Sequence, residues 1–212
     1  MNKEQPFVIT INRELGSGGR TIGQIVAEKL GVPFYDKALI QALMEKYQLS
    51  REEIERLKGQ RHNWWADFKR SLKIMPSTVY PNIIPSVSAV PDFLMTDEIF
   101  HTETEILRGI ADDDSCVIAG RSGFHVFRQH PNHLSVLIQA SLEHRVERLV
   151  RKRGITPAEA QEIIRKVDEG RENYVRKYTG VSRYDTRNYQ LVISADDHTE
   201  DQVASLILQY LQ

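Results

Sequence analysis

A run of glycines between an apolar segment and an amphipathic segment places the strongest constraint on how this chain folds. The apolar residues 7–11 precede Gly16-Ser17-Gly18-Gly19-Arg20-Thr21, and apolar residues then recur at helical spacing from Ile22 to Leu30. This order predicts a buried strand that turns through glycines into a helix. Such a turn directs several backbone N–H groups and the positive end of a helix dipole at one spot, which suits a polyphosphate. We therefore expect residues 16–21 to bind the phosphates of a nucleotide.

This loop departs from the phosphate-binding pattern G-x-x-x-x-G-K-[ST] at its lysine. When the pattern is aligned with Gly19-Arg20-Thr21, it needs glycine where the chain has Glu14 and lysine where it has Arg20. When it is aligned one residue earlier, the lysine falls at Gly19. We expect Arg20 to supply the positive charge, as a planar fork and not as a point charge. We expect the Thr21 hydroxyl to reach Mg²⁺, with Asp36 as the nearest carboxylate.

Composition favours one globular domain over residues 1–212, with a small inserted lobe. The chain has 212 residues, of which 41% are hydrophobic and 27% charged, enough for a full core. Its net charge of -1 gives no electrostatic reason to expect nucleic acid or an anionic membrane as a partner. The N-terminal residues lack the apolar core of a signal peptide, so we expect a cytoplasmic protein. The single cysteine, Cys116, lies in an apolar run and is predicted to be a buried strand residue.

Apolar strands alternate with helical segments along most of the chain. Strands are expected at 7–11, 32–35, 116–119, 134–140 and 189–195. Five such strands separated by helices predict an α/β fold whose parallel sheet is covered on both faces. Residues 59–96 lose this periodicity and hold four of the eight prolines, yet they include Trp64 and Trp65. We interpret them as an irregular inserted lobe that packs on the body or forms a homodimer through its Trp/Pro-rich surface.

The carboxyl edge of the predicted sheet selects the candidate binding residues, because ligands of parallel sheets gather there. Asp36 and Lys37 follow the second strand, and Arg121 follows the third. An acidic triplet at 112–114 precedes a strand, so we expect a solvated turn there and no metal site. A segment rich in arginine, 141–187, carries Arg145 and Arg148 on one predicted helix face. A solvated helix face and a phosphate-binding surface both remain open for this segment.

The chain resembles the nucleoside monophosphate kinases, and most closely the cytidylate kinase-like branch, whose glycine loop also lacks the lysine. The similarity covers nearly the whole chain except about residues 59–96. The segments that carry it are Ile9-Thr10-Ile11-Asn12, the loop from Arg13 to Arg20, Phe34-Tyr35-Asp36-Lys37, Val117-Ile118-Ala119-Gly120-Arg121, the Arg145 to Arg153 helix, Asp168-x-x-Arg171-x-x-Tyr174 and Asn188-Tyr189-x-Leu191. The resemblance implies a P-loop NTPase fold with an acceptor-binding lobe and a helical lid at 141–187. It also implies ATP with Mg²⁺, and CMP or dCMP as the acceptor.

The same resemblance implies roles for individual residues. Asp36 would lie near the acceptor nucleotide, and Arg121 would contact the acceptor phosphate. Ser122 stands where the family has aspartate after that arginine. Arg145, Arg148 and Arg153 would belong to the lid and act in catalysis, while Asp168 and Arg171 would match a later cluster on the substrate side.

Three classes of function stay open from the sequence. The first is ATP-dependent phosphoryl transfer to a small acceptor, cytidylate first, catalysed by positioning and electrostatics. The second is a nucleotide-binding regulator or a catalytically silent kinase relative, which the missing lysine suggests. The third is a structural or partner-binding protein in which the aromatic lobe is the working surface and the P-loop is vestigial.

Overall fold

The computed structural model describes residues 1–2, 4–47, 50, 52, 54, 56, 97–112 and 114–211, and the fold is built from these. The predicted inserted lobe at 59–96, its homodimer surface and the predicted helix cap formed by Ser50 with Glu53 lie outside the described residues.

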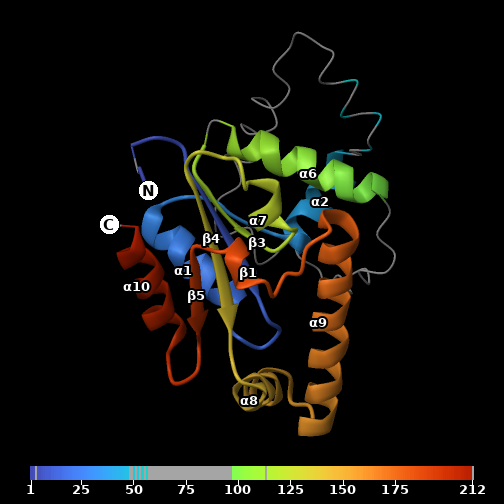
Figure 1. The fold of residues 1–212 in the computed structure, drawn as a ribbon. Helices are drawn as coiled ribbons and strands as arrows, with labels where there is room; N and C mark the ends of the chain where they lie inside the picture. The colour runs from blue at the N-terminus through green and yellow to red at the C-terminus, as the bar shows by residue number, and fades with distance from the viewer. Residues whose placement is uncertain are drawn as a thin grey trace.

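A five-stranded parallel sheet forms the centre of the molecule (Figure 1). The strand order is β2-β3-β1-β4-β5, so the first strand lies in the middle. Every neighbouring pair is parallel, which confirms the predicted sheet. The strands are β1 (Val8–Arg13), β2 (Phe34–Asp36), β3 (Cys116–Ala119), β4 (His133–Gln139) and β5 (Leu191–Ser194).

Helices cover both faces of this sheet. On one face, α1 (Gly19–Leu30) and α10 (Glu200–Tyr210) lie side by side and bury Ile22 and Ile207 against β1 and β4 (Figure 1). On the other face, α2 (Lys37–Tyr47) and α6 (Asp97–Ala111) bury Ile40 and Ile106 against β3. Cys116 is fully buried in that second core, as predicted.

Two further helices lie at the carboxyl edge of the sheet. α8 (Leu142–Arg153) follows β4, and the long α9 (Pro157–Thr179) packs against it through Leu149 and Ile164. Leu15 of the glycine loop packs on the same cluster. A short helix, α7 (Gly123–Val126), follows β3, and a 3₁₀ turn at Thr186–Asn188 precedes β5. This arrangement brings α8, α9 and the glycine loop together around one site.

Local capping sets where these helices begin. Thr156 with Glu159 and Thr199 with Gln202 form capping boxes. Ser141 accepts a hydrogen bond from the backbone N–H of His144 and so caps α8. Among the described residues, no helix is both long and apolar enough to span a membrane.

Candidate functional site

The glycine loop joins β1 to α1 with its glycines in the left-handed region. Gly16 has φ 91° and Gly18, the N-cap of α1, has φ 80°, conformations that glycine adopts without strain. A Cβ on Gly16 would lie 2.8 Å from the carbonyl oxygen of Arg145, so the loop and α8 approach closely. No side chain in the described part of the chain caps the first turn of α1. Its N–H groups therefore suit an anionic ligand.

Arg20 forms an ion pair with Asp36. The Nε–Oδ2 distance is 2.6 Å, and the Arg20 side chain is 51% exposed. The other carboxylate oxygen of Asp36 accepts a hydrogen bond from the backbone N–H of Leu39 at 3.0 Å, which caps α2. Both Asp36 oxygens therefore have protein partners. The roles of Arg20 in phosphate binding and of Asp36 with Thr21 at a metal stay predictions.

A cavity of about 550 Å³ opens beside the glycine loop, between the carboxyl edge of the sheet and α9. Apolar side chains, among them Phe124 and Tyr174, form part of its wall. Its lining contains six cationic side chains and no described Asp or Glu. These six are Arg13, Lys37, Arg121, Lys166, Arg171 and Arg183. A cavity with this charge is suited to an acidic ligand, and the apolar wall is suited to a planar ring.

Arg121 lies at the end of β3 and is held by a buried carboxylate. Its Nη1 donates to both oxygens of Glu103 at 2.7 Å, and the Tyr174 hydroxyl donates to Glu103 at 3.2 Å. The guanidinium also lies 4.9 Å from the centroid of the Tyr174 ring. These contacts fix Arg121 at the cavity wall, where the sequence placed it. Ser122 beside it has a buried hydroxyl with no hydrogen-bond partner among the described residues.

Asp168 joins the glycine loop to three arginines. Its oxygens accept from the backbone N–H of Leu15 at 3.0 Å and from Arg145 at 2.6 Å. Arg171 and Arg183 approach the same carboxylate at 3.3 and 3.5 Å. Sequence analysis placed Asp168 and Arg171 together at the substrate side, and the structure brings them together. Because Asp168 contacts the glycine loop and α8, we infer that it holds these two parts of the site in place.

Arg183 was not singled out from the sequence, yet its side chain is the largest fully buried one among the described residues. It donates to the carbonyl oxygen of Arg13 and to Oδ1 of Asn12, the latter at 3.3 Å. Its own carbonyl accepts from the Tyr189 hydroxyl at 2.7 Å. The segment after α9 is thereby tied to the end of β1. An arginine in a loop gives no local signal of burial, so only its tertiary partners reveal this role.

Arg13 was also missed, although it ends β1 at the ligand edge. Its guanidinium forms no ion pair or hydrogen bond with any described residue. Burial, together with the guanidinium groups of Arg171, Arg183 and Arg121, lowers the pKa of Arg13 well below its usual range. The nearby carboxylate of Asp36 opposes this lowering of the pKa. A guanidinium in such surroundings that makes no ion pair of its own favours a bound anion.

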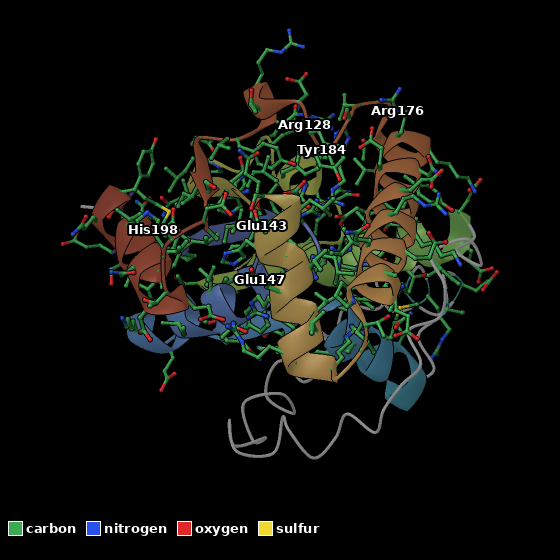
Figure 2. All side chains as sticks on the ribbon, turned by 90° about the horizontal axis from the view of Figure 1, so that it is seen from below. Arg128, Glu143, Glu147, Arg176, Tyr184 and His198 are labelled. Atoms are coloured by element: carbon green, nitrogen blue, oxygen red, sulfur yellow. The ribbon has the colours of Figure 1, made fainter. Side chains whose placement is uncertain are left out.

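The three arginines predicted for the lid separate in the structure. Arg145 pairs with Asp168, and Arg148 pairs with Glu200 of α10 at 2.5 Å, so both face the glycine loop. Figure 2 shows Glu143 and Glu147 on the opposite, outward face of α8. Arg153 is exposed at the last residue of α8 and does not join the other two. Their catalytic roles stay predictions.

Within the described residues, no group of three or more His, Cys, Asp or Glu side chains could hold a metal. Mg²⁺ in nucleotide sites is held mainly by phosphate oxygens, water and one or two protein oxygens. Thr21 lies in the first turn of α1, and its role as such an oxygen donor stays a prediction.

A parallel sheet, a glycine loop leading into α1 and a cationic cavity at the same edge define a P-loop kinase fold. The family model of the cytidylate kinase-like family matches residues 8–197. The chain belongs to this family.

Known relatives are distant. An S-adenosylmethionine-dependent nucleotide dehydratase from Lacinutrix mariniflava is 27% identical over 207 residues, covering 96% of this chain. The chain spans 36% of the length of that relative. A crystal structure of an uncharacterised protein from Eubacterium ventriosum has a TM-score of 0.68 at 22% identity, covering 97% of this chain and 98% of that one. A Thermus thermophilus protein has a TM-score of 0.50 at 20% identity, covering 98% and 99%. These structural similarities concern the fold alone.

Proposed function

We propose that this protein transfers the γ-phosphoryl group of ATP to a nucleoside monophosphate, with CMP or dCMP first among the acceptors. One observation carries the proposal. The cavity beside the glycine loop is lined by six cations and by no described acidic side chain. A phosphate-bearing acceptor would neutralise part of that charge, and the apolar wall would accept its base.

Unpartnered groups in the cavity support the same assignment. The buried Ser122 hydroxyl and the Arg13 guanidinium have no described protein partner, although buried polar groups normally have one. A ligand with oxygens at the cavity would satisfy both. The relative from Lacinutrix mariniflava is named for a nucleotide substrate, which supports a nucleotide here; its dehydratase activity is not proposed for this chain.

In the proposed reaction, an oxygen of the acceptor phosphate bonds to the γ-phosphorus of ATP. The bond from that phosphorus to the β–γ bridging oxygen breaks, and its electron pair leaves with ADP. The chain holds arginines at the site and needs no protein nucleophile, since positioning and charge stabilisation supply most of the catalysis. Mg²⁺, when bound, would neutralise phosphate charge, and Thr21 would be one of its protein contacts.

A panel of acceptors tests this function. ATP is incubated with CMP, dCMP, UMP, AMP and GMP, and both ADP and the diphosphate product are separated and measured. We expect acceptor-dependent turnover with CMP or dCMP. A protein whose melting temperature rises with ATP but which forms no diphosphate would be a catalytically silent nucleotide-binding protein. Absence of any shift with nucleotides would favour the partner-binding class.

Ser122→Ala tests the acceptor site with little risk to the fold. The hydroxyl has no described protein partner, so its loss removes only a contact to ligand. One lost hydrogen bond of about 1 kcal/mol should raise the KM for the acceptor roughly fivefold and leave the KM for ATP unchanged. Ser205→Ala, at a half-buried serine of α10 outside the cavity lining whose hydroxyl donates to the Asp201 carbonyl, is the control. An unchanged acceptor KM would place the acceptor elsewhere.

A further inference from the structure

With Gly18 as the second glycine of G-x-x-x-x-G-K-[ST], the chain departs from the phosphate-binding pattern at three positions, Arg13, Gly19 and Arg20, and the first two contact each other. In this alignment the first glycine falls at position 13 and the lysine at position 19. This chain has Arg13 and Gly19 at those positions. A cationic residue and a glycine have therefore exchanged places within one motif.

The structure explains why the exchange must involve both positions. A Cβ on Gly19 would lie 2.5 Å from Cβ and 2.9 Å from Cγ of Arg13. Side-chain atoms do not approach each other so closely, so the Arg13 stem fills the space that a lysine at position 19 would need. Glycine is the residue that leaves this space open.

The head of Arg13 lies where a ligand can reach it. It passes over Gly120, at which a Cβ would lie 2.1 Å from Nη1, and it lines the cavity. No described carboxylate lies within ion-pair distance of it. Arg20, by contrast, pairs with Asp36 at 2.6 Å and is half exposed. Of these two arginines, Arg13 is the one that makes no ion pair with a described residue.

We propose that Arg13 performs the task of the missing P-loop lysine and contacts the terminal phosphates of ATP at the boundary between the glycine loop and the acceptor cavity. This assignment rests on the proposed function for the identity of the ligand. In this assignment, the planar guanidinium of Arg13, at the end of β1, takes the place of the lysine ammonium that would extend from α1. Glycine at position 19 is needed for this arrangement, because any larger side chain there would collide with the Arg13 side chain.

Six variants test the proposal: Arg13→Ala, Arg13→Lys, Arg13→Gly, Arg20→Ala, Gly19→Lys and the double variant Arg13→Gly/Gly19→Lys. The double variant restores the first glycine and the lysine of the standard pattern. The dissociation constant for ATP is measured by calorimetry, and kcat is measured with the acceptor that the panel identifies. Thermal melts show which variants are folded. Arg165→Ala, an exposed arginine on α9, is the matched control.

We expect Arg13→Ala to weaken ATP binding about tenfold or more and to lower kcat about 100-fold. Arg13→Lys should keep part of the ATP affinity and part of kcat. Gly19→Lys alone should bind ATP poorly because its side chain meets Arg13, whereas the double variant should recover most of the affinity lost in Arg13→Gly. The control should match wild type.

Two results would overturn the proposal: wild-type ATP affinity in Arg13→Ala, or a larger loss in Arg20→Ala than in Arg13→Ala. If the double variant does not fold, Arg13→Ala and Arg13→Lys still decide the matter. A wild-type protein that binds ATP but phosphorylates no acceptor would refute the proposed function and leave the ATP affinities as the test of Arg13. A wild-type protein that binds no ATP would refute both.

Discussion

His133, at the start of β4, is a residue whose ionisation affects the stability of the fold. Its Nε2 and the Thr10 hydroxyl are 2.7 Å apart, and its ring lies 6.0 Å from that of Phe127. Burial, and then the nearby His130, lower the pKa of His133 to about 4, while a backbone hydrogen bond at Phe127 opposes the shift. The imidazole is therefore neutral in the folded protein at neutral pH.

Linkage gives the direction of the pH effect. The unfolded chain binds a proton at this histidine near pH 6.5, whereas the folded chain binds it near pH 4. Between these values the unfolded state holds more protons, so this stability is full above pH 6.5 and is lost as the pH falls toward 4. From pH 7.5 to 5 we expect wild type to lose about 2 kcal/mol more unfolding free energy than His133→Gln.

Urea unfolding at both pH values measures this difference. His198→Gln, at an exposed position visible in Figure 2, is the matched control and should behave as wild type. An equal pH dependence in wild type and His133→Gln would show that His133 is not the responsible group.

At the scale of elements, α9 carries a glycine in the middle of the helix face that borders the cavity. Lys166, Val167, Gly170, Arg171 and Tyr174 lie along this face. Glycine inside a helix costs about 1 kcal/mol relative to alanine. A Cβ on Gly170 would meet no atom of the described residues within 4 Å, so their packing does not require glycine there. The open space is on the cavity side and is available to an acceptor.

Gly170→Ala and Gly170→Leu separate the two effects. Gly170→Ala should raise the melting temperature by about 2–4 °C through helix propensity. Gly170→Leu should fill part of the cavity and raise the KM for the acceptor at least about tenfold, with the KM for ATP little changed. Glu169→Leu, next along the helix and exposed, is the control for side-chain size. If Gly170→Leu kept the wild-type acceptor KM, the acceptor would not occupy this side of α9.

The ends of helices could be predicted where neighbouring residues in the sequence determine them. The capping boxes at Thr156 and Thr199 mark the starts of α9 and α10. Each box depends on hydrogen bonds between two residues that are three positions apart, so it can be recognised in the sequence. Glycine at position 154 ends α8 in the left-handed conformation, as the pattern predicted. The order of the strands in the sheet has no such local signal, because it depends on how the helices pack against the two faces of the sheet.

At the scale of the whole molecule, the candidate site was only partly predictable. The loop and Arg121 were found because parallel strands deliver their following residues to one edge. The partner of Arg121, Glu103, lies on α6 and was not singled out from the sequence. Arg13 and Arg183 acquire their roles from contacts between β1, α9 and the segment after it, which no spacing in the sequence encodes.

Asp168 gives the last prediction, because it is the contact through which these distant segments are held together. It is buried and receives hydrogen bonds from the glycine loop, α8, α9 and the segment after α9. Asp168→Asn keeps the shape of the side chain but removes the charge that offsets Arg145, Arg171 and Arg183. Breaking a buried ion pair from one side costs about 3–5 kcal/mol, so the melting temperature should fall by roughly 6–15 °C.

The same change should weaken ATP binding, since Oδ1 of Asp168 holds the N–H of Leu15 in the loop. Asp185→Asn, in an exposed pair with Arg187, is the matched control and should leave both the melting temperature and the ATP affinity near wild type. Thermal melts and calorimetry on the two variants measure both effects. A small change in melting temperature with a large loss of ATP affinity would mean that Asp168 contacts the ligand directly. Wild-type values of both would show that the three arginines are balanced by other groups.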